Sequence, residues 1–105
     1  MTARSSIEAA SVVRVRLPSP LRSYTGAAEV GVAVPVLATE LPPTIGGVLA
    51  GLDIAYPGIR FRIVDEQGRV RPHIKLFVGN VVTRDLGAPI PSGAPLMIVA
   101  ALSGG

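Results

Sequence analysis

A chain of 105 residues is long enough for a single domain with one modest hydrophobic core. Hydrophobic residues make up 49% and the mean hydropathy is +0.51, which excludes a disordered polymer. There is no cysteine, which excludes disulfides, thiol nucleophiles and thiolate metal sites. No apolar run approaches the roughly 18–20 residues of a membrane span, and residues 1–11 have no signal-peptide core, so we expect a cytoplasmic protein without membrane contact.

The net charge is +3, and nine of the ten basic residues are arginines. Half of the basic residues lie close together in the sequence: Arg60, Arg62, Arg69, Arg71 and Lys75. Aromatic residues make up only 4% of the chain and are not interleaved with these cations. The pattern therefore favours a solvated arginine-rich face over a nucleic-acid site.

The first third of the chain predicts a flexible leader followed by an antiparallel hairpin. Residues 1–11 are polar and alanine-rich, without periodicity. Apolar and polar residues alternate in VVRVRL (12–17), which is typical of a half-buried strand. A proline- and glycine-broken loop (18–28) follows, and alternation resumes over 29–36. Pro35 cannot donate a ladder hydrogen bond, which predicts an edge strand or the end of a strand.

A helix is predicted next, because five apolar residues recur at helical spacing: Ile45, Val48, Leu49, Leu52 and Tyr56. Thr44 is placed to cap the first turn, and Pro57-Gly58 to end the helix. Three glycines within the helix lower its intrinsic stability by up to about 1 kcal/mol each, so we interpret them as packing positions: Gly46, Gly47 and Gly51.

The last part of the chain predicts further strands. Residues 59–72 show alternation around a turn at 65–68. Residues 73–83 predict a hairpin that turns at Gly79-Asn80, with a short return strand. A loop follows, and the nearly continuous apolar run LMIVAAL (96–102) predicts a central strand buried on both faces. The fold class is therefore α+β, with one mixed sheet of four to five strands and one main helix across one face.

No pattern for catalysis, metal binding or cofactor binding is present in the sequence. His73 is the only histidine, and no serine lies in a nucleophile-elbow pattern. TIGGVLAG (44–51) lacks the Lys-Ser/Thr of a phosphate-binding loop. The acidic pair at Asp65-Glu66 is explained by turn chemistry. We therefore predict that the chain binds no cofactor and is not itself an enzyme.

The chain ends on ALSGG, directly after PLMIVA (95–100), one of its most apolar stretches. This ending, together with TIGGVLAGLDIAYPGI, DEQGRVRPHIKLFV, the Gly79-Asn80 hairpin and IPSGAPLMIVAALSGG, resembles the MoaD/ThiS family of ubiquitin-like sulfur carriers. The resemblance covers residues 12–105, which we take as the carrier domain. It implies the ubiquitin-like β-grasp fold, in which the first and last strands lie parallel and adjacent.

The resemblance also implies a mechanism for the tail. An ATP-dependent adenylyltransferase partner, using ATP and Mg²⁺ of its own, would activate the carboxylate of Gly105 as an acyl-adenylate, and a sulfur donor would convert it to a thiocarboxylate. Gly104 would allow close approach in the partner's narrow site, because it has no Cβ. Ala101, Leu102 and Ser103 would line the tail's path. The exposed face of the sheet would dock the partner through an apolar patch.

The sulfur acceptor implied first is a pyridoxal-phosphate-dependent cysteine synthase, and next the large subunit of molybdopterin synthase. The uncharged IPSGAPL and the basic net charge depart from many family members and affect the partner's identity, because charge complementarity steers association. Two other functions stay open. One is a ubiquitin-like protein modifier attached through Gly105, and the other is a β-grasp binding module whose diglycine end has no chemistry.

Overall fold

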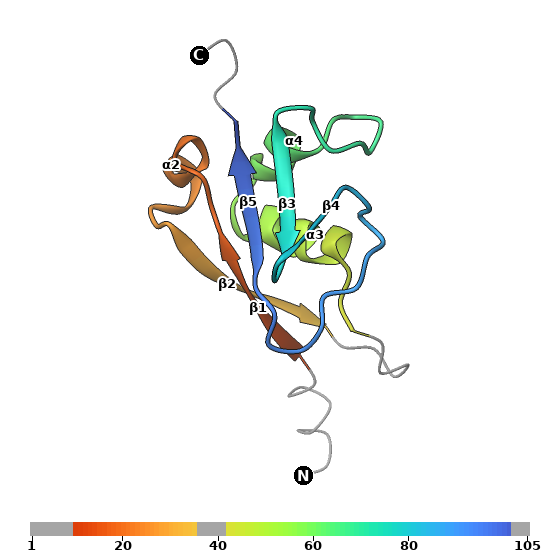
Figure 1. Cartoon of the computed structure of the whole chain (residues 1–105). Helices are drawn as coiled ribbons and strands as arrows, with labels where there is room; N and C mark the ends of the chain where they lie inside the picture. Colours follow the sequence, from red (N-terminus) through yellow and green to blue (C-terminus); the bar gives the residue numbers. More distant parts are fainter. Residues whose placement is uncertain (1–9, 36–41, 102–105) are drawn as a thin grey trace.

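The computed structural model describes residues 10–35 and 42–101, which form one mixed sheet with helices on one side (Figure 1). The sheet order is β2-β1-β5-β3-β4. Its strands are β1 (Ala10–Arg16), β2 (Glu29–Pro35), β3 (Ile74–Val78), β4 (Val81–Thr83) and β5 (Leu96–Ala100). The helical segments of the described residues are η1 (Ser19–Leu21), α2 (Arg22–Thr25), α3 (Ile45–Ala55) and α4 (Ile59–Ile63).

The last strand lies at the centre of the sheet, as predicted. β5 pairs in parallel with β1, with Val15 opposite Leu96, and antiparallel with β3 along its whole length. The adjacent parallel first and last strands of the β-grasp are thereby confirmed. β2 is an edge strand and ends at Pro35, so both expectations for that proline are met.

One face of the sheet packs against α3 and forms the hydrophobic core. The helix buries the four apolar residues Ile45, Val48, Leu49 and Leu52. The Thr44 hydroxyl accepts a hydrogen bond from the Gly47 N–H at 3.1 Å, which confirms the predicted N-cap. The helix ends at Ala55, just before Pro57-Gly58. From the strands, the core takes alternate side chains, among them Val15, Leu76 and Ile98.

Two of the three glycines predicted as packing positions, Gly46 and Gly51, are confirmed as such, whereas a Cβ on Gly47 would make only ordinary contacts. A Cβ built on Gly51 lies 2.9 Å from Cγ1 of the buried Val32, and one built on Gly46 lies 3.2 Å from the carbonyl oxygen of Leu86. Both distances are shorter than ordinary van der Waals contact. The missing side chains therefore let α3 approach β2 and the 84–88 loop closely.

Three sequence predictions need correction. Residues 59–63 form helix α4 and not an alternating strand, although the predicted turn at 65–68 is present, with Gly68 N–H donating to Asp65 O at 3.0 Å. The predicted loop 18–28 contains η1 and α2. β1 begins at Ala10, inside the segment assigned to the leader.

The burial predicted for the central strand is also only partly correct. Leu96 and Ile98 are buried, whereas Met97 and Val99, on the opposite face, are only half-buried. The helices cover one face of β5 and leave the other accessible. Within the described residues, no helix is long and apolar enough to cross a membrane.

Candidate functional site

The predicted site residues follow the central strand. Ala101 is exposed and is the last described residue, and its N–H donates to the carbonyl oxygen of His73 at 2.8 Å. The other four predicted residues, Leu102, Ser103, Gly104 and Gly105, lie outside the described residues. The structure therefore places only the start of the tail, where Ala101 continues β5 and is bonded to His73, the residue before β3.

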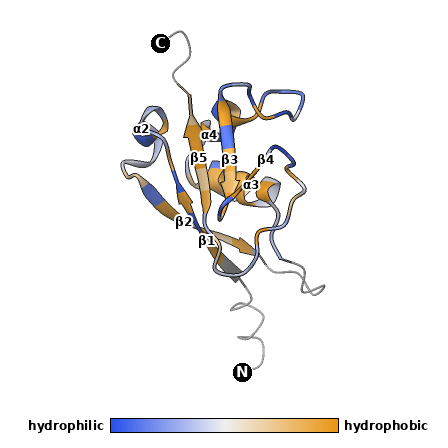
Figure 2. Cartoon of the chain, in the orientation of Figure 1, coloured by the Kyte–Doolittle hydropathy of each residue, from blue (hydrophilic) through white to orange (hydrophobic). Residues whose placement is uncertain are grey.

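The helix-free face of the sheet carries an apolar row through its centre. Register places Met97 of β5 between Arg16 of β1 and Phe77 of β3, and Phe77 opposite Val82 of β4. Met97 and Phe77 are half-buried, and Val82 is 54% exposed. In Figure 2, β5 and most of β3 carry the hydrophobic colour, with hydrophilic segments in β1 and β3. This surface, the central row, meets the expectation of an apolar patch on the exposed face.

Cations border the central row. Arg14 and Arg16 both contact Glu29 of the neighbouring strand, with N–O distances of 2.7 and 3.5 Å. Lys75 is exposed on β3, opposite Val99. The carboxylate of Glu29 neutralises part of the arginine charge, whereas Lys75 forms no ion pair with any of the described residues.

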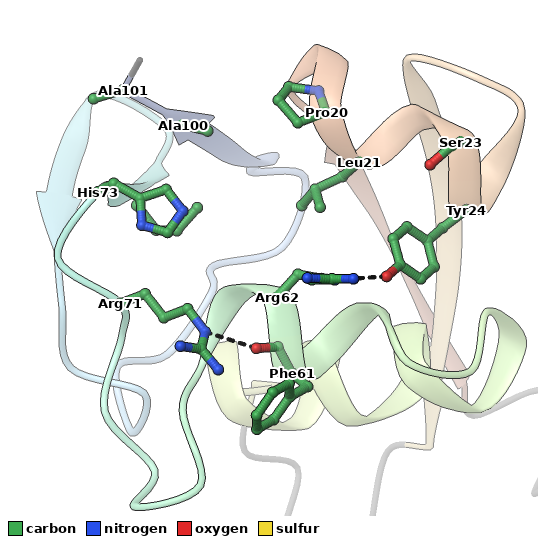
Figure 3. A pocket seen from close by; sticks show the side chains of 11 residues that line it. Pro20, Leu21, Ser23, Tyr24, Phe61, Arg62, Arg71, His73, Ala100 and Ala101 are labelled. Atoms are coloured by element: carbon green, nitrogen blue, oxygen red, sulfur yellow. Dashed lines mark hydrogen bonds between the residues drawn. The ribbon is translucent and has the colours of Figure 1, made fainter. Parts of the chain in front are cut away.

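A second feature near the tail is a groove of about 550 Å³ on the helix side of the sheet (Figure 3). We call it the exit groove, because Ala100 and Ala101 form one wall. Its other lining residues come from the β1–β2 connection, α4 and the segment before β3: Pro20, Leu21, Ser23, Tyr24, Phe61, Arg62, Arg71, His73 and Ile74. The described lining residues include two arginines, one histidine and no acidic side chain.

Both arginines of the exit groove are held in place by neighbouring residues. Arg62 Nε donates to the hydroxyl of Tyr24 at 2.8 Å, and this bond raises the pKa of Arg62 above its ordinary value. Arg71 Nε donates to the carbonyl oxygen of Phe61 at 2.7 Å. The Arg71 guanidinium also lies over the Phe61 ring, 4.5 Å from its centroid, in a cation–π arrangement.

The five clustered cations do not form one surface. Arg62 and Arg71 line the exit groove, whereas Arg60 lines a separate depression that also contains Asp53 and Asp65. Lys75 lies on β3 beside the central row. The sequence cluster is thus divided, which removes the continuous basic stripe expected of a nucleic-acid site.

The described residues bring together no group of three or more histidine, cysteine, aspartate or glutamate side chains suited to a metal ion. Their core contains no polar or charged side chain. What these residues offer is therefore surface chemistry: an apolar row, a basic groove and the start of a tail between them.

Sequence reasoning missed the exit groove. Its central contact joins Tyr24 to Arg62, which are 38 residues apart. No local pattern encodes such a pair. The nearest signal was the clustering of Arg62 and Arg71, which the sequence could not assign to one site.

No protein-family model matches the sequence, and no curated protein matches it. Solved structures do match. SAMP1 from Haloferax volcanii is 24% identical, with a TM-score of 0.73 over 90% of this chain and all of that chain. A chain of the Amycolatopsis orientalis BexX/CysO complex is 25% identical, with a TM-score of 0.72 over 89% of this chain and 99% of that one.

Mycobacterium tuberculosis CysO, described as an antigen, is also 25% identical, with a TM-score of 0.72 over 86% of this chain and 99% of that chain. These neighbours span nearly the whole described domain. Their TM-scores of 0.72 to 0.73 indicate the same overall arrangement of strands and helices. This chain therefore has the MoaD/ThiS-like ubiquitin β-grasp fold that the sequence resemblance implies.

Proposed function

We propose that this chain is a sulfur carrier that works through the carboxylate of Gly105. The observation that carries the proposal is the Ser-Gly-Gly sequence (103–105), which is separated from the central strand of a β-grasp domain by two residues. The CysO and SAMP1 neighbours support it, because they are small proteins of the same fold and nearly the same length.

The proposed reaction has two steps. A carboxylate oxygen of Gly105 attacks the α-phosphorus of ATP on a partner adenylyltransferase, which forms the acyl-adenylate and releases pyrophosphate. Sulfide from a sulfur donor then displaces AMP and leaves the thiocarboxylate. ATP and Mg²⁺ would be held by the partner. This chain would contribute the carboxylate, which is ionised at neutral pH, and glycines that let the partner approach the backbone.

The central row is the proposed docking surface. It includes Met97 of β5, the strand that leads into the tail, and Met97 precedes Ala101 by four residues along that strand. One neighbour was solved as a complex of CysO with BexX, which supports a protein partner. The proposed sulfur acceptors remain a cysteine synthase of the pyridoxal-phosphate type or a molybdopterin synthase large subunit.

A second candidate function is conjugation to proteins through Gly105. One observation favours it: the match to SAMP1, one structure of which is described as a small archaeal modifier protein. Both functions begin with an activated terminal carboxylate. They differ in the nucleophile, which is sulfide for the carrier and a lysine amine of a target for the modifier.

The test is the intact mass of the chain after incubation with ATP, Mg²⁺ and sulfide or thiosulfate in lysate of its source. A carrier gains the mass of one sulfur in exchange for one oxygen, and a chain lacking Gly105 does not. Arg69→Gln is a matched control, because Arg69 lies outside both surfaces, and it should gain the same mass. Higher-mass conjugates, linked through Gly105 to lysines, would instead establish the modifier. If neither product forms, both proposals are refuted and the β-grasp binding module remains.

A further inference from the structure

The exit groove combines a basic rim with an apolar wall. Arg62 and Arg71 each donate a hydrogen bond through Nε, and their terminal nitrogens have no hydrogen-bond partner among the described residues. Neither forms an ion pair within residues 10–35 and 42–101. The two terminal nitrogens of a guanidinium match the two oxygens of a carboxylate. The groove therefore presents two oriented carboxylate-binding ends.

The shape of the groove favours an extended chain. The parallel ladder between β1 and β5 consists of only two register pairs, Val15 with Leu96 and Arg16 with Met97. β5 continues to Ala100, so its last residues have no strand neighbour on the β1 side. The exit groove lies there, between β5 and the turn of η1 and α2 (Figure 3). An extended segment is the backbone form that lies along such a strand.

We propose that the exit groove binds an extended acidic segment of the protein that receives the tail, with apolar residues between its carboxylates. This identity of the partner rests on the proposed function, whereas the groove rests on described residues alone. Charge complementarity selects the occupant, since two arginines and no acidic side chain line the groove. Its volume of about 550 Å³ is larger than a small inorganic anion needs. Its apolar lining by Leu21 and Ile74 also favours a ligand with apolar groups.

The proposal gives the tail exit two contact surfaces of different chemistry. The central row lies on the helix-free face of the sheet and is apolar, whereas the exit groove lies on the helix side and is basic. A partner that contacts both would enclose the tail between them. Orientation would come from the groove, because the positions of Arg62 and Arg71 are fixed by Tyr24 and Phe61.

The test uses the full chain and a fluorescent five-residue peptide in which glutamates alternate with valines. Two other probes are the same peptide with lysines in place of glutamates, and inorganic phosphate. Binding is followed by fluorescence anisotropy, and the site by amide chemical shifts in a ¹⁵N-labelled chain. The acidic peptide should shift the amides of His73, Ala100 and Ala101, and the lysine peptide should not.

Arg71→Gln and Arg62→Gln should each weaken the acidic peptide by at least about fivefold, because each removes a bidentate carboxylate partner. Arg69→Gln is the matched control: it removes the same charge from an exposed side chain that bonds to Gln67 outside the groove, and it should weaken binding by less than about twofold. Thermal unfolding checks that each variant is folded.

Three results would overturn the proposal. The first is equal weakening by Arg69→Gln and Arg71→Gln, which would indicate only general charge attraction. The second is equal binding of the lysine peptide. The third is displacement of the peptide by phosphate at the same concentration with the same amide shifts, which would show a small-anion site. None of these readouts uses Gly105, so failure of the mass test would refute the carrier and leave this result standing.

Discussion

Replacing Gly51 with alanine tests the close contact on which the helix side of the fold depends. The Cβ of alanine would lie 2.9 Å from Cγ1 of Val32 and 3.5 Å from the carbonyl oxygen of Ala33. Val32 is 4% exposed and β-branched, so its methyl group has little freedom to turn away. Either α3 moves away from β2 or Val32 leaves its preferred rotamer.

Two terms of opposite sign decide the magnitude. Alanine is favoured over glycine within a helix by up to about 1 kcal/mol. Overpacking a well-filled core by one methyl group costs about 1–3 kcal/mol. The sum predicts a loss of about 0–2 kcal/mol in the free energy of unfolding.

Gly47→Ala is the matched control, because its Cβ would meet Oγ1 of Thr44 at 3.4 Å and Val34 at 3.9 Å, which are ordinary contacts. We expect this variant to be unchanged or stabilised by up to about 1 kcal/mol. Both variants gain helix propensity, so this gain largely cancels in their difference. That difference measures the contact with Val32 and should be about 1–3 kcal/mol, with Gly51→Ala the less stable.

The assay is urea unfolding followed by circular dichroism, completed by a double-mutant cycle with Val32→Ala. In the Val32→Ala background the clash is removed, so Gly51→Ala should change from neutral or destabilising to stabilising by up to about 1 kcal/mol. The reasoning is refuted if Gly51→Ala is as stable as Gly47→Ala, or if its effect is the same in both backgrounds.

Thr44→Ala removes the hydroxyl that caps α3 and should cost about 1 kcal/mol, measured by urea unfolding. The hydrogen bond from the Arg69 backbone N–H lowers the pKa of Asp65 below its ordinary 3.8. The ionised Asp65 carboxylate therefore stabilises the fold above pH 3.8, and this stabilisation is lost as the pH falls through the lowered pKa. The urea midpoint of the protein should therefore exceed that of Asp65→Asn at neutral pH, and the gap should close below about pH 4; a gap that stays constant contradicts this. Met97→Glu should leave the fold intact and reduce the fraction of chain that gains the sulfur mass by at least about tenfold. Val12→Glu, at a 66% exposed position outside the central row, should have little effect on it, and equal loss in both variants would remove the central row from the docking surface.

Features encoded by nearby residues were predictable. Alternation in β1 and β2, the Thr44 cap and the Gly79-Asn80 turn each depend on residues within a few positions, and all are present. The central position of β5 was predictable because its apolar run is nearly continuous. The prediction of burial on both faces failed, because composition does not show which face the helices will cover.

The segment that forms α4 shows why another prediction failed. Ile59, Phe61 and Ile63 fit a strand, since alternate residues share a face, but Ile59 and Ile63 also share a face of a helix. The structure buries both isoleucines and leaves Phe61 54% exposed, which only the helix allows. The deciding contact comes from outside the segment: the Asp53 carboxylate accepts hydrogen bonds from the N–H groups of Gly58 and Arg60, at 3.0 Å each. It caps the turn from outside the segment.

The position of β5 in the sheet allows a partner to bind the tail without disturbing the core. Five register pairs join β5 to β3, and the Ala101 N–H is bonded to the carbonyl oxygen of His73 just beyond them. The proposed partner, which would bind the residues after Ala101, would therefore act on a strand held at the centre of the sheet. The side chains that would contact the partner, Met97 on one side and Arg71 on the other, lie outside the buried core. The proposed chemistry at Gly105 and the proposed recognition at these two surfaces can thus be changed separately from stability, and this separation makes the Met97→Glu and Arg71→Gln tests decisive.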